Sequence, residues 1–411
     1  MKQISLSLIL AVISLLTANA QEPSKTTEKN ENYIENDLIS LSGKDGISFQ
    51  TKAGDFLFKP YVLIQTRAQF NYYDDEGLSL MDQDNVLNSG FAIPYALVGF
   101  AGTAFDKITY NIALNTAASG AALLNQAWID INLKSSLRFR VGKFKTPYNQ
   151  AYLVRLGQTL FPTPPTSMQT TVNMPFGLNS VNPKISTGFD IGVQMHGLVK
   201  NKIDYRVGIF NGTGIGTNRA TNTLSDDYGI PSLLYAARLA YMPMGPMPLH
   251  QGDPNDLHNY KMLFALSGSA NIEANAESSN DYRTGIEFAV LKNRFYFNAE
   301  AYSMTMNYVE RQKTAPLYTY WGSYAQAGYF ISKRLQPTVR VDFMDRNSTK
   351  EKGYLMTNSI GLNYYIIGNN LKLQAYYEHL SKLGHETEFE ANDDDNGLAE
   401  HKAMVQLQFS F

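Results

Sequence analysis

The sequence predicts an all-β protein: a 16-stranded antiparallel transmembrane β-barrel with long outer loops and short periplasmic turns. Three observations support this prediction. Many segments alternate apolar and polar residues over lengths sufficient for a tilted membrane-spanning strand. The chain is also rich in aromatic residues, with 26 Tyr and 22 Phe, which barrels concentrate at the two membrane interfaces. Finally, the last alternating segment ends on Phe411.

The first twenty residues have the pattern of a secretory signal peptide. Lys2 supplies the positive start, Ile4 to Leu16 form a mostly apolar run, and Ala18 to Ala20 read as a small-x-small cleavage site. The apolar run is shorter than the roughly 20 residues of a membrane-spanning helix. We therefore expect residues 1–20 to be removed near Ala20, the alternative being an uncleaved anchor helix.

The rest of the chain divides into a leader and a barrel. Residues 21–54 begin with a polar stretch that has little to bury, and we assign them to a polar periplasmic leader. Residues 55–411 form the predicted transmembrane β-barrel. The absence of cysteine rules out a disulfide framework. The formal net charge of −2 argues against nucleic acid as a partner.

Period-2 alternation defines the predicted strands. In the first of them, apolar residues such as Phe58, Val62 and Ile64 alternate with polar residues such as Gln65 and Arg67. One face therefore contacts lipid and the other a wet lumen. The predicted strands lie at 56–72, 91–104, 108–116, 124–133, 137–145, 187–198, 203–210, 233–242, 261–271, 282–290, 295–306, 320–331, 335–344, 356–366, 371–379 and 398–411.

The gaps between these strands alternate in length. Short turns such as 105–107, 134–136 and 199–202 alternate with longer polar stretches. Barrels have this rhythm because their periplasmic turns are short and their outer loops long. Residues 243–260 break it, since they are long and rich in Pro where a short turn is expected. We interpret them as a periplasmic excursion.

Several motifs together resemble a known family. The segment from Arg138 to Tyr148, followed by Gln150 to Leu153, resembles the strand that leads into the third loop of the phosphate-selective porin O/P family. Further matches follow in order at 208–212, 237–243, 299–302, 335–342 and 361–365, and the resemblance covers roughly residues 55–411. It implies a sixteen-stranded, trimeric porin that is general or anion-preferring, in which the third loop folds inward.

On this basis the loop from Thr146 to Asn182 is the candidate constriction. We expect it to fold into the lumen with Lys145, Tyr148 and Arg155 near the narrowest point, the alternative being a loop that lies over the outer mouth. An anion needs fixed positive charge along its path. The remaining candidate pore-lining residues are Arg67, Arg138, Arg140, Arg206 and Arg340.

The charges on the predicted lumen face are nearly balanced, which predicts at most a weak anion preference. Arg138 and Arg140 point the same way on one strand. They form either a short basic ladder or ion pairs with Asp130 or Asp204, and the sequence leaves both interpretations open.

The predicted function is an outer-membrane porin for passive diffusion of small hydrophilic solutes or ions, with a weak, phosphate-type anion preference. A barrel with a structural or adhesion role, its lumen plugged, is the alternative. An enzyme is disfavoured because only His196 of the six histidines is predicted to face the lumen, and no nucleophile is tied to it by spacing. We expect no catalytic residue, no metal site and no cofactor.

The expected partners follow from the predicted location, the outer membrane of a Gram-negative-type bacterium. They are small solutes and anions, outer-membrane lipid and, as the resemblance implies, two further copies in a homotrimer. Phe411 resembles the signal by which the barrel-assembly machinery recognises its clients. Its alternative role is that of an aromatic residue at the membrane interface.

Overall fold

The computed structural model describes residues 38–43, 46–72, 89–168, 188–212, 233–252, 260–272, 279–308, 317–345, 348, 354–383 and 401–411. The chain divides after Asp37 into two units, and all described residues belong to the second, Leu38–Phe411. No helix within these residues has the length and hydropathy needed to cross a membrane.

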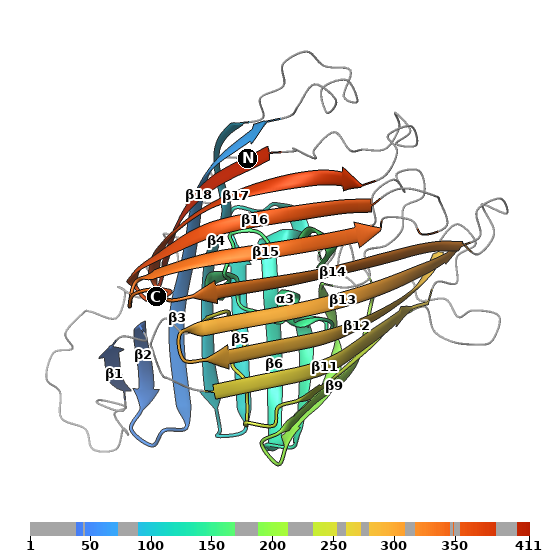
Figure 1. Ribbon diagram of the computed structural model, residues 1–411. Coiled ribbons are helices and arrows are strands. Elements are labelled where there is room, and N and C mark those ends of the chain that lie inside the picture. The colour runs from blue at the N-terminus through green and yellow to red at the C-terminus, as the bar shows by residue number, and fades with distance from the viewer. Residues whose placement is uncertain are drawn as a thin grey trace, which may run out of the picture. The chain divides into compact units, whose positions relative to one another are not determined.

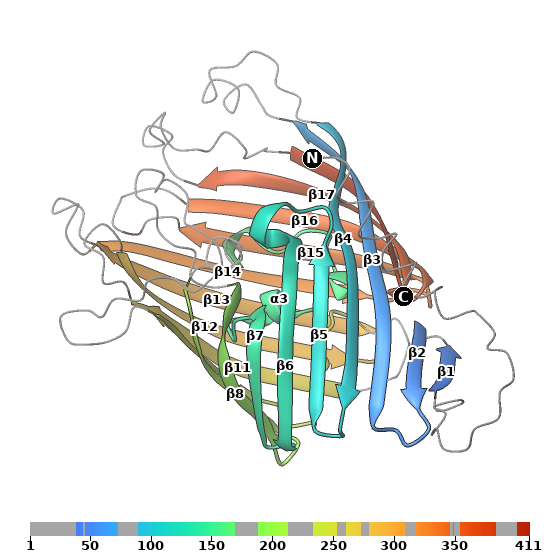
Figure 2. The ribbon, with the colours of Figure 1, turned by 180° about the vertical axis from the view of Figure 1, so that it is seen from behind.

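The described unit is built around one antiparallel sheet that closes on itself (Figures 1 and 2). Of its eighteen strands, β3 to β18 form the barrel, and β18 pairs with β3 from His401↔Tyr72 to Ser410↔Leu63 to close it. Closure leaves no unpaired edge in the wall. The barrel strands are β3 Phe56–Tyr72, β4 Ser89–Ala104, β5 Ile108–Asn115, β6 Leu124–Lys134, β7 Leu137–Lys145, β8 Phe189–Val199, β9 Ile203–Phe210, β10 Leu234–Tyr241, β11 Tyr260–Asn271, β12 Ser279–Lys292, β13 Phe295–Tyr308, β14 Leu317–Tyr329, β15 Leu335–Asp345, β16 Tyr354–Ile367, β17 Leu371–Leu383 and β18 His401–Ser410.

The predicted fold class is confirmed strand by strand. The predictions 56–72, 137–145 and 203–210 coincide with β3, β7 and β9, and every other predicted strand overlaps its counterpart with ends displaced by a few residues. The displacements are largest at the outer ends, where β12, β14 and β17 extend beyond the alternating segments because backbone pairing continues into the loops.

A hairpin precedes the barrel within the segment assigned to the leader. It consists of β1 Leu38–Gly43 and β2 Gly46–Thr51. The two strands pair with each other over their whole length, whereas the strand pairing of β2 with β3 consists of Phe49↔Phe58 and Gln50↔Leu57 alone. The hairpin is therefore a small appendage of the barrel (Figure 1).

The two faces of the wall carry different side chains. On β15, Val339 and Val341 point outward and are 53% and 45% exposed, whereas Arg340 and Asp342 point into the lumen and are each 2% exposed. The same alternation runs along the other strands. The outer face is thus an apolar surface for lipid, and the inner face carries the polar side chains.

The connection between β10 and β11 is the long turn that the sequence set apart. Its described part, up to Gly252, does not extend away from the barrel. Met242 and Met247 are 3% and 6% exposed and belong to a buried apolar cluster with Leu263 and Leu291 on the wall. This turn therefore packs against the inner face of β11 and β12. It is long, as predicted, but its described part lies inside the barrel and does not project into the periplasm.

The hairpin gives the first testable prediction. Because β2 joins the wall through only two residue pairs, deleting residues 38–51 should leave the barrel folded. The expected result is an unchanged fraction of heat-modifiable, SDS-resistant protein after refolding, measured by gel migration with and without boiling. A chain that no longer shows the fast-migrating folded band would mean that the hairpin is needed for barrel closure.

Candidate functional site in the barrel lumen

The first part of the candidate loop, Thr146 to Met168, crosses the inside of the barrel. It contains the short helix α3 Gln150–Leu153 and the 3-10 turn η2 Leu156–Gln158. Both ribbon views show α3 within the outline of the barrel wall (Figures 1 and 2). Residues 169–182 of the predicted loop lie outside the described residues. The part that is described takes the inward course and not the alternative course over the outer mouth.

The loop begins with a turn held from two sides. Lys145, the last residue of β7, donates from Nζ to the carbonyl oxygens of Tyr152 and Val154 at 2.6 and 2.9 Å. Asn149 caps α3 by accepting from the Tyr152 N–H at 2.8 Å. The Lys145 ammonium is thus occupied by the loop itself, so the structure places this candidate residue at the base of the loop.

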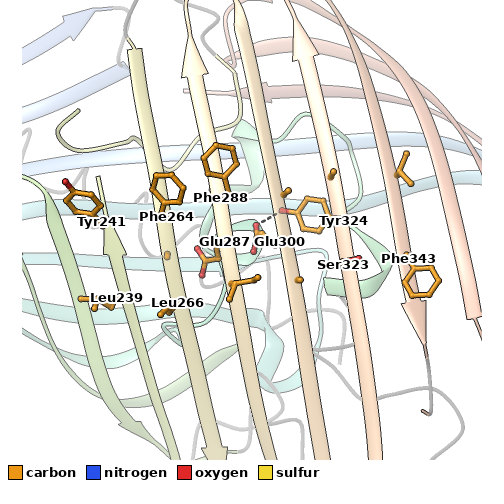
Figure 3. A pocket seen from close by; sticks show the side chains of 16 residues that line it. Leu239, Tyr241, Phe264, Leu266, Glu287, Phe288, Glu300, Ser323, Tyr324 and Phe343 are labelled. Carbon is orange, nitrogen blue, oxygen red and sulfur yellow. Dashed lines mark hydrogen bonds between the residues drawn. The ribbon is translucent and has the colours of Figure 1, made fainter. Parts of the chain in front are cut away.

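A carboxylate on the opposite wall holds the start of α3. Glu300 on β13 accepts from the backbone N–H groups of Gln150 and Ala151 at 3.2 and 2.9 Å. It also accepts from the hydroxyls of Tyr302 and Tyr324; Figure 3 shows the bond to Tyr324. Carboxylates bind the unpaired N–H groups at a helix start favourably. Glu300 therefore ties the loop to the far side of the lumen.

Tyr148, predicted near the constriction, lies in an apolar cluster beside this anchor. It is 0% exposed and packs with Ala151, Met168, Tyr302 and Tyr324. Its hydroxyl donates to the Thr284 carbonyl oxygen at 3.1 Å. Burial raises the pKa of the Tyr148 hydroxyl above its usual range, so the group stays protonated and remains a donor. Tyr148 thus anchors the loop and does not face open lumen.

The middle of the loop is held through its carbonyl oxygens. Almost every carbonyl from Leu156 to Thr163 accepts a hydrogen bond from a side chain of the wall or from the β10–β11 turn. Backbone groups that are buried without partners cost free energy, and here the lumen face supplies the partners. The donors are Gln65 to Leu156, Gln408 to Gly157, Gln251 to Gln158, Lys372 and Gln374 to Thr159, Asn363 and Gln374 to Leu160, Arg67 to Pro162, and Arg340 to Thr163.

The end of the described loop is held by Asp342 and Tyr320. Asp342 on β15 accepts from the Ser167 N–H at 3.2 and 3.3 Å, and the Tyr320 hydroxyl donates to the Ser167 carbonyl at 2.7 Å. Two wall carboxylates, Glu300 and Asp342, thus receive the loop near its two described ends.

Two predicted pore-lining arginines belong to this support. Arg67 donates to the Gln406 side chain at 2.8 Å as well as to Pro162, and Arg340 forms an ion pair with Glu378 at 3.3 Å. The Arg340 guanidinium also lies 4.4 Å from the centre of the Phe161 ring. Both residues face the lumen as predicted, but their guanidinium N–H groups donate to carbonyl oxygens of the loop.

The other predicted arginines lie along β7 and β9. Arg138 and Arg140 both approach Asp130, which is buried, at 3.4 and 2.6 Å. Arg206 pairs with Asp204 at 2.8 Å. The guanidinium side chains of Arg138, Arg140 and Arg206 keep 33%, 24% and 18% exposure. Pairing with Asp130 and a shared basic face are therefore both present.

This basic face continues in a row of which the sequence predicts only a part. Arg138, His196, Arg206 and Arg238 are cross-strand neighbours on β7, β8, β9 and β10. Arg238 was missed. It pairs with Glu287 in a fully buried contact, and only its place in the pairing register reveals that it joins this row.

Arg155 is the exposed charge of the loop. It lies between α3 and η2. Its side chain is exposed, whereas the preceding residues Leu153 and Val154 are only 7% and 1% exposed. The structure therefore separates the three residues predicted at the constriction: Lys145 and Tyr148 hold the loop, whereas Arg155 lies at its surface.

The outer face of β10 to β15 carries an apolar groove of about 710 Å³. Figure 3 shows Phe264, Phe288 and Phe343 along it, and Glu300 and Tyr324 bonded to each other behind it. Since its lining is almost wholly apolar and lies on the lipid side of the wall, it is not a site for a hydrophilic solute.

Phe411 lies at the closure of the barrel. Its N–H and carbonyl oxygen pair with the carbonyl oxygen and N–H of Val62, both at 3.2 Å. The ring is 40% exposed and lies 6.0 Å from that of Phe409. Phe411 is thus an outward aromatic residue at the end of the last strand pair.

The Glu300 anchor gives the second prediction. In Glu300→Ala, two N–H groups of α3 lose a charged acceptor, so the local opening of the loop start should become at least about tenfold more frequent, since such bonds contribute roughly 1.5–3 kcal/mol. Hydrogen exchange measured by mass spectrometry should show faster exchange of the Gln150 and Ala151 amides. Ser323→Ala, on the outer face, is the matched control. Unchanged exchange in the folded Glu300→Ala barrel would remove Glu300 from the anchor.

Comparisons with known proteins agree with this architecture. A profile for the family described as phosphate-selective porin O and P matches residues 64–411 of the chain. A search of curated protein sequences finds no match.

Solved porin structures share the fold. An anion-selective porin from Comamonas acidovorans superimposes with a TM-score of 0.57 at 10% identity, covering 87% of this chain and 100% of that chain. The outer-membrane channel DcaP of Acinetobacter baumannii gives a TM-score of 0.53 at 12% identity, covering 90% and 100%. OmpT of Vibrio cholerae in its trimer form gives 0.50 at 10% identity, covering 87% and 99%.

Identities this low establish the shared fold alone, whereas the family profile spans most of the chain. Together with the closed barrel and the loop inside it, these findings show that the chain belongs to the phosphate-selective porin O and P family and is an outer-membrane channel for passive diffusion.

Proposed function

We propose that this channel prefers small anionic solutes and that the inward loop is its constriction. The observation that carries the proposal is the charge on the β3 to β9 side of the lumen. Apart from Arg67 and Lys145, which bond to the loop, five cationic side chains there are at least partly exposed, whereas two of the three carboxylates on the same faces are buried. The cations are Lys59, Arg138, Arg140, Arg155 and Arg206, and the carboxylates are Asp130, Asp190 and Asp204.

Burial matters because a carboxylate covered by its partner arginines presents little negative charge to a passing ion. Asp130 is 0% exposed beneath Arg138 and Arg140, so a solute meets the guanidinium groups first. Arg140 also lies 4.0 Å from the centre of the Trp128 ring, which keeps it against the wall. Fixed positive charge of this kind raises the local concentration of anions.

The preference is expected to be moderate. The family name refers to phosphate, but the loop contributes Arg155 as its exposed charge, and most other lumen arginines are paired with carboxylates. A single guanidinium can partly replace the hydration of an anion, whereas tight phosphate selectivity needs several converging donors. A channel for small anions in general therefore fits these residues better than one for phosphate alone.

The remaining parts of the proposal concern export and assembly. The signal peptide is removed near Ala20, Phe411 is the residue that the barrel-assembly machinery recognises, outer-membrane lipid covers the apolar belt, and the channel works as a homotrimer. Support comes from the sequence of residues 1–20, from the outward position of Phe411 at barrel closure, and from the trimer form of the structural neighbour OmpT. We assign no enzymatic activity to the chain.

Reversal potentials in planar bilayers test the charge preference. Under a tenfold potassium chloride gradient, the wild-type channel should show a reversal potential of the sign expected for chloride preference. Removing one lumen charge in Arg155→Gln or Arg140→Gln should lower the anion-to-cation permeability ratio about two- to threefold, since a unit charge at several ångströms in water changes the energy of an ion by about one RT.

Lys107→Gln, which removes a charge from a short turn outside the barrel strands, is the control and should leave the ratio unchanged. A wild-type channel that prefers potassium, or a ratio insensitive to both arginine substitutions, would refute the proposal.

A further inference from the structure

We propose that the part of the β10–β11 turn up to Gly252 is an internal brace, with Gln251 as its positioning residue, that pins the constriction loop against the β11 to β18 wall and confines permeation to the β5 to β9 side. This inference rests on the proposed role of the loop as the constriction. It assigns a function to a segment that a barrel of this kind does not otherwise need, because its other turns at that end are short.

Gln251 forms a two-bond bridge to the loop. Its backbone N–H donates to the Gln158 carbonyl oxygen at 2.8 Å, and its side-chain Oε1 accepts from the Leu160 N–H at 2.8 Å. The residue is 6% exposed. Such a pair of bonds to residues two apart fixes both the position and the direction of the loop at this point.

The next residue shows how closely the turn approaches the wall. Gly252 has a φ of +101°, and a Cβ placed there would lie 3.0 Å from Nε2 of Gln336 on β15. A glycine permits both this backbone conformation and this approach. The turn therefore approaches β15, a strand that also bonds to the loop through Arg340.

An apolar core inside the lumen joins the two segments. Leu160 and Phe161 of the loop and Met242 and Met247 of the turn are all at most 6% exposed and belong to one cluster. The wall contributes Ala240, Leu263, Ala265, Ala289, Leu291, Tyr296, Tyr376 and Met404 to the same cluster. Apolar side chains packed in this way leave no room for a hydrated solute.

Burial differs sharply between the two sides of the lumen. On β12 to β15, every lumen-facing residue whose burial is described is buried. On β5 to β9, many lumen-facing residues remain partly exposed, among them Thr109, Asn111, Trp128, Arg138 and Arg206. A solute can pass only where side chains are solvated, so the path follows the second side, beside Arg155 of the loop.

The bond to Leu160 is the one that the wall cannot replace. Among the described residues, the wall side chains around residues 157–160 donate hydrogen bonds to the carbonyl oxygens of the loop and do not accept from its N–H groups. Gln251 instead accepts from the Leu160 N–H. Without it, this N–H is left without its partner, and Gln251 keeps only its backbone bond to the Gln158 carbonyl oxygen.

The first test compares single-channel currents of Gln251→Ala with wild type. Loss of the bond should loosen residues 158–161 and raise open-channel current noise severalfold, with a larger mean conductance. Lys261→Met is the matched control, because Lys261 donates to Met244 of the same turn at 2.9 Å but does not reach the loop. Gln251→Glu retains an acceptor for the Leu160 N–H, so its open-channel current noise should stay close to that of the wild-type channel.

The second test uses the absence of native cysteine, which makes single reporters unambiguous. Thr338→Cys reports on the sealed side: Thr338 is 3% exposed, and a Cβ at Gly361 would lie 2.7 Å from its Oγ1 and 3.3 Å from the Phe161 ring. Thr109→Cys reports on the open side. A charged, water-soluble thiol reagent should modify Thr109→Cys rapidly and Thr338→Cys slowly in the otherwise wild-type channel.

Adding Gln251→Ala should speed modification of Thr338→Cys at least about tenfold, because a buried bond and its neighbouring packing are lost together. Modification of Thr109→Cys should not change. If Gln251→Ala folds poorly, Met247→Ala loosens the same core from within and carries the same expectation.

Equal reactivity of the two cysteines without any brace substitution would overturn the confined path. Slow Thr338→Cys modification that persists in Gln251→Ala and in Met247→Ala would overturn the brace. Both outcomes are independent of ion preference, so they are distinguishable from a failure of the anion-channel proposal, which the reversal potential decides. Heat-modifiable migration of each variant separates a repositioned loop from a barrel that has not folded.

Discussion

A backbone segment that crosses the inside of a barrel must find hydrogen-bond partners there, and the rest of the lumen is organised around this requirement. The carbonyl oxygens of residues 156–163 are supplied by side chains from β3, β15, β16, β17 and β18 and by the β10–β11 turn. Two carboxylates, Glu300 and Asp342, receive its N–H groups. Many of the polar side chains on the inner face of the barrel therefore serve as hydrogen-bond partners for the backbone of this one loop.

This complementarity links the loop to the closed barrel. The loop bonds to partners as distant in sequence as Gln408, which is 251 residues from Gly157. Such contacts exist only when β18 has paired with β3 and brought the last strand next to the first. The constriction is therefore a consequence of closure, and a barrel that has not closed has no defined lumen path even if most of its strands are paired.

Strand periodicity predicts the wall well and the interior poorly, for a physical reason. Alternation states which face a side chain occupies, and Arg67, Arg140 and Arg340 face the lumen as predicted. It does not state what lies opposite, so it could not show that Arg67 and Arg340 bond to the loop while Arg140 stays partly exposed.

Where the lumen itself is apolar, alternation fails altogether. On β10 the inward residues are Leu234, Ala236, Arg238 and Ala240, three of them apolar. Leu234 and Ala236 pack with Phe144 and Phe210 of the neighbouring wall, whereas Ala240 packs with the loop and the turn. The polar signature that marks an inner face is therefore absent, and Arg238 was overlooked. Residues 243–260 were recognised as unusual in length, but no local pattern indicates that a turn re-enters the barrel.

The same division separates lumen charges that hold structure from those that meet a solute. Arg238 with Glu287, Arg340 with Glu378, and Lys372 on the Thr159 carbonyl are buried and bonded to the wall or the loop. A count of every lumen-facing charge, which includes buried carboxylates such as Asp130, Asp190, Glu300 and Asp342, makes the lumen look nearly neutral, which is the conclusion that the sequence supports. On the β3 to β9 side, counting only solvated groups leaves Lys59, Arg155 and the arginines of β7 and β9, which is an excess of positive charge. Ion preference in this channel therefore depends on which half of the lumen the loop and the turn leave open, and the same residues would give a different channel if the loop rested on the other wall.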